Sequence, residues 1–166
     1  RLVIFLGGEG DLRAAAMTLL PRFGPGPVVV GPAAAGLAEA TRSARAALSG
    51  LLAAPGWEQA PRPVHADDLL PERVLVGDAE ARRALVERAY APLAASQGSL
   101  LDTLSAYLGA GRSLEAAART LYVHPNTVRY RLRRVCDVTG WDPLDARESY
   151  VLQTALAVGR LDAAEG

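Results

Sequence analysis

A cluster of arginine residues lies in the second half of the chain, on a segment whose spacing indicates a helix. Between Arg119 and Arg134 there are five arginines and no acidic residue. At roughly 100° per residue, Val128, Leu132 and Val135 share one narrow face of this helix. The opposite face carries polar and basic side chains: Asn126, Arg129, Tyr130, Arg133 and Arg134, with Thr127 at its edge. A helix that enters the major groove of DNA needs both faces, one to dock on its own domain and one with donors for phosphates and base edges.

The arginines of this segment differ in the roles we expect of them. Three are expected to bind phosphates or guanines, against the alternative of a solvated basic face without a ligand: Arg129, Arg133 and Arg134. Arg131 flanks the apolar face instead. We therefore expect it to form a structural ion pair, with Glu115 or Asp102, rather than to contact DNA.

Four further side chains complete the candidate DNA-binding residues. Asn126, Thr127 and Tyr130 are expected to set the register on DNA and to read bases. For Asn126 and Thr127 an equal alternative is that they cap the helix and contact a phosphate. His124 precedes the helix and is expected to be its N-cap or a neighbour of a phosphate.

Two short helices joined by a four-residue connection would position this face. Ser113 is a candidate N-cap for a first helix that ends near Leu121. The connection Tyr122–Pro125 then leads into the reading helix, expected over residues 125–136. Tyr122 stands at the turn position that often holds glycine. The spacing therefore predicts a helix-turn-helix unit.

Flanking helices are expected on both sides of this unit. An apolar stripe from Leu100 to Leu108 predicts a helix that is ended by Gly109 and Gly111. Asp142 followed by Pro143 predicts an N-cap and the first position of a last helix, which extends to about Leu161. This last helix is uncharged over residues 149–159 and apolar around more than half of its circumference, which favours homodimerisation. The alternative is burial within its own domain or against the first domain.

The arginine-rich segment resembles a known family. Residues 121–135 read LYVHPNTVRYRLRRV and are followed by Thr139 and Gly140, which is similar to the C-terminal helix-turn-helix of PucR/CdaR-type regulators of purine and sugar-diacid metabolism. The resemblance spans about residues 100–161. It implies a bacterial transcription regulator that binds double-stranded DNA. Pro125 stands where Fis-like relatives often have a base-reading arginine, which leaves the identity of the base contacts open.

The first half of the chain alternates apolar runs with helical patterns. Leu2–Leu6 and Val28–Val30 predict short strands, the first of them buried. Helical patterns follow each strand, the first capped by Asp11 and the second extending from about Ala34 to Ala53. The order predicts part of an α/β domain, and residues 43–48 resemble the degenerate GGDEF-like domain that often precedes the PucR-type motif.

The predicted fold class is mainly α, with three regions along the chain. A partial α/β, GGDEF-like domain is expected over residues 1–62, a helical connector over 63–98 and an all-α helix-turn-helix domain over 99–162. Residues 54–67 contain three prolines and one glycine and are the expected linker. Residues 68–76 could form a helix or a strand, and a helix is favoured; a helix is predicted over 78–95.

Residues Gly7–Asp11 invite comparison with the signature of a cyclase. That signature needs a glycine pair followed directly by acidic residues, whereas here Gly10 separates Glu9 from Asp11. A strand-to-helix turn is the simpler interpretation. With two histidines, one cysteine and no lysine, the chain also offers no Ser-His-Asp arrangement and no lysine chemistry. We therefore expect no catalytic residues, no metal site and no cofactor.

The composition limits the partners and the compartment. The 18 basic residues, all arginine, balance 18 acidic residues, so any DNA binding must depend on local charge. One cysteine excludes an internal disulfide and favours the reducing cytoplasm, and no membrane-spanning segment is expected. The chain begins with Arg1 and is expected to be part of a longer polypeptide, with the effector sensed outside it. The alternative function is a ligand- or nucleotide-sensing module whose helical end mediates protein contacts.

Overall fold

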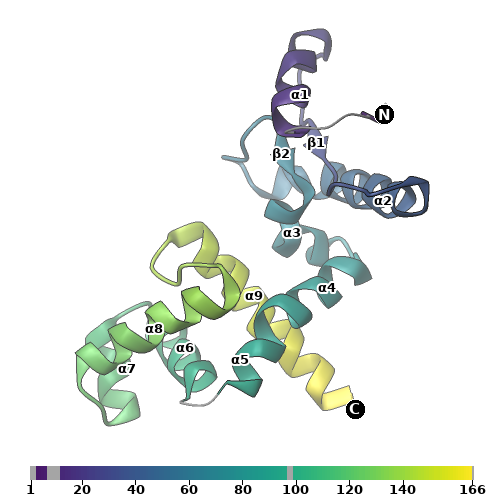
Figure 1. The fold of residues 1–166 in the computed structure, drawn as a ribbon. Coiled ribbons are helices and arrows are strands. Elements are labelled where there is room, and N and C mark those ends of the chain that lie inside the picture. The colour runs from purple at the N-terminus through teal and green to yellow at the C-terminus, as the bar shows by residue number, and fades with distance from the viewer. Residues whose placement is uncertain (1–2, 7–11, 97–98, 166) are drawn as a thin grey trace. The chain divides into compact units, whose positions relative to one another are not determined.

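The computed structural model describes residues 3–6, 12–96 and 99–165, and most of them are helical (Figure 1). The chain divides into two compact units, Arg1–Ala81 and Arg82–Gly166. Residues 63–98, expected as a connector, are thus shared between both units. The expected domain boundaries after residues 62 and 98 stay a prediction.

Unit 1 contains a small parallel sheet covered by a long helix. Its elements are α1 (Leu12–Leu19), η1 (Leu20–Arg22), β1 (Val29–Val30), α2 (Leu37–Ala53), η2 (Ala54–Gly56), β2 (Val64–His65), η3 (Ala66–Leu69), α3 (Leu70–Leu75) and the start of α4 (Ala79–Leu85). Strands β1 and β2 pair in parallel, with Val29 opposite Val64. A Cβ at Gly50 of α2 would lie 2.8 Å from Cγ1 of Val29, so the missing side chain lets the helix approach β1 closely.

Two expectations for unit 1 are wrong. Val3–Leu6, expected as part of a buried strand, forms no strand, and these side chains are between 40% and 67% exposed. An apolar run becomes a strand only when a neighbouring strand is available to pair with it. Residues 54–67, expected as a linker, instead contain η2 and β2, and Val64 within them is buried. The expected N-cap Asp11 lies outside the part of the chain that the structure describes.

An ion pair between Arg73 and Asp78 stabilises the end of unit 1. Nη2 of Arg73 lies 2.9 Å from Oδ2 of Asp78, and the arginine side chain is almost wholly buried. Oδ1 of Asp78 accepts hydrogen bonds from the backbone N–H groups of Glu80 at 2.9 Å and Ala81 at 3.2 Å, which caps α4. Burial alone would raise the pKa of Asp78, but hydrogen bonds from Ser49, Ala81 and Arg73, with the charge of Arg73, lower it below its ordinary value.

Helices are the only regular secondary structure in the described residues of unit 2. After the end of α4 come the π-helical turn η4 (Val86–Tyr90), α5 (Ala91–Ala95), α6 (Leu100–Gly109), α7 (Leu114–Leu121), α8 (Pro125–Thr139) and α9 (Ala146–Glu165). Helices α6, α7 and α8 pack on one another, and α9 packs on η4. The largest core side chains are fully buried leucines from five helices: Leu85, Leu93, Leu104, Leu132 and Leu152. The helices expected over residues 68–76 and 78–95 are confirmed as η3, α3, α4, η4 and α5.

The last helix begins later than its sequence predicts. Asp142 is not an N-cap, because its Oδ1 accepts from the backbone N–H of Leu144 at 2.9 Å and closes a local turn. Helix α9 starts at Ala146, and Oδ1 of Asp145 accepts from the backbone N–H of Glu148 at 2.9 Å in the manner of an N-cap. Two aspartates three residues apart both suit a cap, and packing decided between them.

Gly159 lets α9 lie against the aromatic ring of Tyr90. A Cβ at Gly159 would overlap ring atoms of Tyr90, which belongs to η4. Gly109, at the end of α6, has nothing within 4 Å of its Cβ position and no positive φ. The two glycines therefore differ in the space around them.

We predict that Gly159→Ala destabilises unit 2 by about 1 to 3 kcal/mol, because overpacking forces Tyr90 or α9 to move. The matched control Gly109→Ala should stabilise the same unit by about 0.5 to 1 kcal/mol, since alanine favours the helix. Urea unfolding followed by the fluorescence of Trp141, in a Trp57→Phe background, measures both. Equal effects of the two substitutions would contradict the prediction.

We predict that Asp78→Asn lowers the free energy of unfolding of unit 1 by about 1 to 3 kcal/mol at neutral pH. Within the described ranges, Arg73 loses the nearer of its two carboxylate partners and keeps Asp67, whose Oδ1 lies 3.9 Å from its Nη1. The lowered pKa means that the carboxylate stabilises the fold fully above its unfolded-state pKa, about 3.9. This contribution is lost as the pH falls below that value. Unfolding followed by Trp57 fluorescence in a Trp141→Phe background, from pH 7 to pH 3, measures the difference between parent and variant. The difference should shrink at acidic pH, and the exposed control Glu58→Gln should show none.

Candidate nucleic-acid interface

Helix α7 begins at the cap that its sequence predicts. The Oγ of Ser113 accepts a hydrogen bond from the backbone N–H of Ala116 at 3.2 Å. Ala117 and Ala118 are buried, and these small side chains let α6 and α8 approach α7. The cap and the inward face of the first helix are therefore confirmed.

The turn between α7 and α8 is made without glycine. Tyr122 takes the left-handed conformation with φ 54° and ψ 40°, and the backbone N–H of Val123 donates to Ala118 O at 3.0 Å. His124 is the N-cap of α8, since its Nδ1 accepts from the backbone N–H of Asn126 at 3.2 Å. Pro125 occupies the first helical position, where no N–H is needed.

Helix α8 buries the face that its sequence predicts. Val128, Leu132 and Val135 are at most 1% exposed. They lie one turn apart on the side of α8 that contacts α6 and α7. This apolar seam fixes which side chains of α8 point away from the domain.

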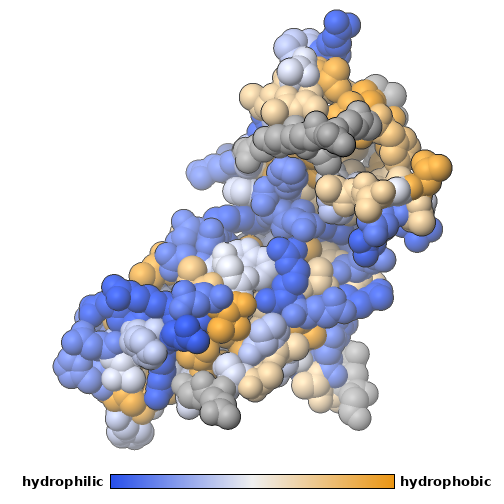
Figure 2. All heavy atoms as spheres, in the orientation of Figure 1, coloured by the Kyte–Doolittle hydropathy of each residue, from blue (hydrophilic) through white to orange (hydrophobic). Residues whose placement is uncertain are grey.

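The polar face of α8 is exposed, as expected. Exposed side chains comprise His124, Asn126, Arg129, Tyr130, Arg133 and Arg134, and Thr127 is half-buried. Figure 2 shows that hydrophilic residues cover much of the surface over α7 and α8. The structure thus gathers the predicted site residues on one side of one helix.

Two arginines of this face are already held by neighbours. Nη1 of Arg129 donates to Oδ1 of Asn126 at 2.6 Å, and Nη1 of Arg134 lies 3.1 Å from Oδ2 of Asp137. Arg133 makes no hydrogen bond or ion pair with any residue that the structure describes. Within the described ranges its guanidinium therefore has no competing partner.

Arg131 has the structural role that its position predicts, but a different partner. Its Nη1 donates to Oγ1 of Thr103 at 3.3 Å, and Thr103 is fully buried in α6. Arg131 forms no ion pair with Glu115 or Asp102, both of which lie in the described part of the chain. The expected ion pair is wrong because α8 crosses α6 at the level of Thr103.

Helix α8 ends at Thr139, three residues beyond the expected end of the reading helix, and Gly140 is its C-cap. Gly140 has φ 78°, and its N–H donates to Cys136 O at 2.8 Å. Partial burial of Cys136, with the carboxylates of Asp142, Glu148 and Asp137, raises the pKa of its thiol. No group of three potential metal-ligating side chains occurs within the described ranges.

Two long-range contacts that sequence reasoning missed support the interface from behind. The guanidinium of Arg88 in η4 lies 5.1 Å from the ring centroid of Trp141, directly after the end of α8. Nη2 of Arg160 in α9 donates to Oγ of Ser105 in α6 at 2.7 Å. No local pattern could reveal pairs that lie more than 50 residues apart in sequence.

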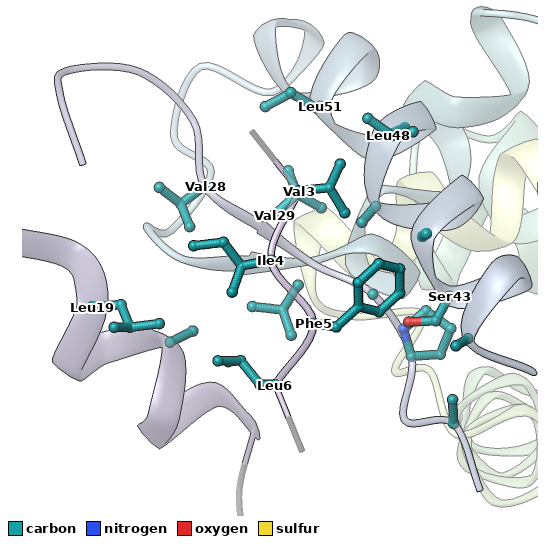
Figure 3. A pocket seen from close by; sticks show the side chains of 18 of the residues that line it. Val3, Ile4, Phe5, Leu6, Leu19, Val28, Val29, Ser43, Leu48 and Leu51 are labelled. Carbon is teal, nitrogen blue, oxygen red and sulfur yellow. The ribbon is translucent and has the colours of Figure 1, made fainter. Parts of the chain in front are cut away.

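Unit 1 contains an apolar hollow of about 940 Å³. Figure 3 shows Val3, Ile4, Phe5 and Leu6 lying along it, opposite side chains of α2 such as Leu48 and Leu51. Ser43 is the one polar side chain labelled there. None of the lining residues that the structure describes is titratable.

Comparisons with known proteins agree with this geometry. Residues 100–158 match the family described as the PucR C-terminal helix-turn-helix domain. These residues form a PucR-type helix-turn-helix domain. The purine catabolism regulatory protein of Bacillus subtilis is 41% identical to the chain over 63 residues, which are 38% of this chain and 12% of that protein.

Other relatives extend beyond the PucR-type domain. The crystal structure of a regulator of polyketide synthase expression from Bifidobacterium adolescentis has a TM-score of 0.86 and 41% identity, over 95% of this chain and 63% of that one. An uncharacterized protein of Mycobacterium tuberculosis is 54% identical over 144 residues, 87% of this chain. The chain spans only 35% of that mycobacterial relative. No helix that the structure describes is long and apolar enough to cross a membrane.

The two faces of α8 give a direct test within the PucR-type domain. We predict that Leu132→Ala lowers the free energy of unfolding of unit 2 by about 2 to 5 kcal/mol, because it leaves a cavity in the seam. Its neighbour Arg133→Ala should change that free energy by less than about 0.5 kcal/mol. Urea unfolding followed by Trp141 fluorescence compares them. A large loss of stability in Arg133→Ala would show that the faces are wrongly assigned.

Proposed function

We propose that this chain is the DNA-binding part of a sequence-specific transcription regulator, with α8 as the helix that enters the major groove. The observation that carries the proposal is the exposed basic face of α8, opposite the buried seam Val128–Leu132–Val135, in a PucR-type domain. A reading helix must be anchored on one side and carry donors on the other. Helix α8 meets both requirements.

The side chains of α8 have separable roles in this proposal. Arg133 and Arg134 bind phosphates or guanines, and Arg134 exchanges Asp137 for a DNA oxygen when it does so. Arg129 acts with Asn126, because their hydrogen bond holds the guanidinium and the amide as one donor group. Thr127 and Tyr130 set register and read bases. His124 keeps the first turn of α8 in place through its cap and lies near a phosphate.

The neutral net charge favours a second candidate, a sensing module whose helical end binds protein. The distribution of charge speaks for DNA instead. The five arginines of Arg119–Arg134 have no acidic residue among them, so the local surface is positive although the chain is neutral. Binding to DNA that weakens steeply with salt separates the two candidates.

Homodimerisation is also part of the proposal, but the argument for it is no longer the apolar surface of α9. The apolar surface of α9 no longer supports a dimer, because unit 2 itself buries that surface. The buried side chains are Val151, Leu152, Ala155 and Leu156. The remaining support is the size of the interface, since one reading helix buries only about 600 to 1,000 Å² on DNA. Two copies on a symmetric site, with half-sites about 34 to 36 Å apart, would supply a specific interface.

For unit 1 we propose a degenerate GGDEF-like origin without enzymatic activity. The order β1–α2–β2, with a parallel sheet, supports the first part. The interrupted acidic sequence of residues 7–11, which lie outside the described ranges, supports the second. The effector would be sensed by a region outside this chain, and the single half-buried thiol fits a reducing cytoplasm.

DNA binding by the arginine face can be tested without knowing the operator. Selection from random-sequence DNA by the 166-residue chain should yield inverted repeats with half-sites one helical turn apart. We predict that Arg133→Ala and Arg134→Ala weaken binding to a selected duplex. A lost phosphate contact lowers the slope of log K against log salt by about 0.9. A lost guanine contact costs about 1 to 3 kcal/mol at one base pair.

Arg45→Ala is the matched control, because it removes the same charge from the exposed surface of α2. It should leave affinity and salt slope unchanged. Fluorescence anisotropy over a range of salt concentrations measures the three single variants and the Arg133→Ala/Arg134→Ala double variant. Parent-like binding by the Arg133/Arg134 double variant would refute the assignment of this face, and selected sites without symmetry would refute the dimer.

A further inference from the structure

Tyr122 holds a backbone conformation that its side chain disfavours. Its φ of 54° and ψ of 40° place it in the left-handed region, which residues with a Cβ enter only at a cost. Glycine at this position would complete the same turn without that cost, since the Tyr122 backbone N–H bonds to Arg119 O in either case. The turn therefore does not require tyrosine.

The side chain of Tyr122 does not contribute to the folded core. It is 96% exposed, the highest value among the large hydrophobic side chains in the described ranges. Its hydroxyl makes no hydrogen bond with any residue that the structure describes. Strained backbone conformations are often kept where function needs the side chain. An exposed aromatic ring on a strained residue thus points to a ligand.

The position of Tyr122 relative to α8 indicates which part of DNA it meets. It lies two residues before His124, the N-cap of α8. A helix with its side chains is about 10–12 Å wide and fills a major groove about 12 Å wide. The chain that leads into the N-terminus of such a helix must therefore cross the rim of the groove. The rim is formed by the sugar–phosphate backbone.

We propose that Tyr122 is a positioning residue whose phenolic hydroxyl donates a hydrogen bond to a backbone phosphate at the edge of the groove. This inference rests on the proposed DNA binding by α8. The exposed Arg119, whose carbonyl accepts from Tyr122 N–H, contributes positive charge to the same end of α7. A contact to phosphate carries no base information, so Tyr122 holds α8 in register while the face of α8 reads the sequence.

Tyr122→Phe and Tyr122→Gly separate the hydroxyl from the backbone strain. Both should weaken binding of the 166-residue chain about tenfold, the typical effect of losing a hydrogen bond to a charged group. The loss should be equal on a selected operator and on a scrambled duplex. The salt slope should not change, because a neutral hydroxyl displaces no counterion. Tyr122→Gly should melt at the parent temperature or above it, so its weaker binding cannot be attributed to unfolding.

Ser99→Gly is the control for strain alone, because Ser99 is also left-handed, with φ 58°, at the start of α6. It should bind DNA as the parent does. Parent-like binding by Tyr122→Phe overturns the hydroxyl contact, and a changed base preference in either variant overturns the phosphate assignment. These outcomes leave DNA binding by α8 intact. Failure of the parent to bind any duplex refutes the proposed function, and this inference with it.

Discussion

The candidate nucleic-acid interface on α8 depends on the burial of one apolar seam. Val128, Leu132 and Val135 fix the rotation of α8 about its own axis, and that rotation decides which side chains face outward. The seam can be buried because α7 places Ala117 and Ala118 against it, and these small side chains let α8 pack closely on α7. The positions of the arginines therefore follow from packing behind them and not from contacts among themselves.

Supporting contacts hold the two ends of α8 in place. At its start, the side chain of His124 caps the first turn, and Pro125 needs no hydrogen-bond acceptor. At its end, Trp141 lies under the guanidinium of Arg88, and along its length Arg131 is tied to Thr103. A helix fixed in this way presents Asn126, Arg129 and Arg133 with little freedom. Under the proposed DNA binding, such pre-organisation would reduce the entropy that is lost when α8 meets its ligand.

Unit 1 is held together differently from the apolar seam of unit 2. Its sheet has two residues in each described strand, and its stability relies on contacts of α2 with β1 and on the buried ion pair of Arg73 with Asp78. An apolar hollow lined by Val3–Leu6 stays open beside this sheet. The larger relatives, of which the matched residues cover 12% to 63%, contain further residues that this structure does not include.

Local sequence determined the helix-turn-helix, because caps, turns and helical faces depend on residues three or four positions apart. For that reason the sequence alone predicted three features: the N-cap Ser113, the buried face of α8 from its 3.6-residue spacing, and the turn at Tyr122. Tertiary structure alone decided that Val3–Leu6 forms no strand, that β2 lies within the expected linker, and that Thr103 receives Arg131. Strand pairing and the choice of a side-chain partner depend on segments distant in sequence. Both are decided only when helices and strands pack, so the local spacing of residues cannot predict them.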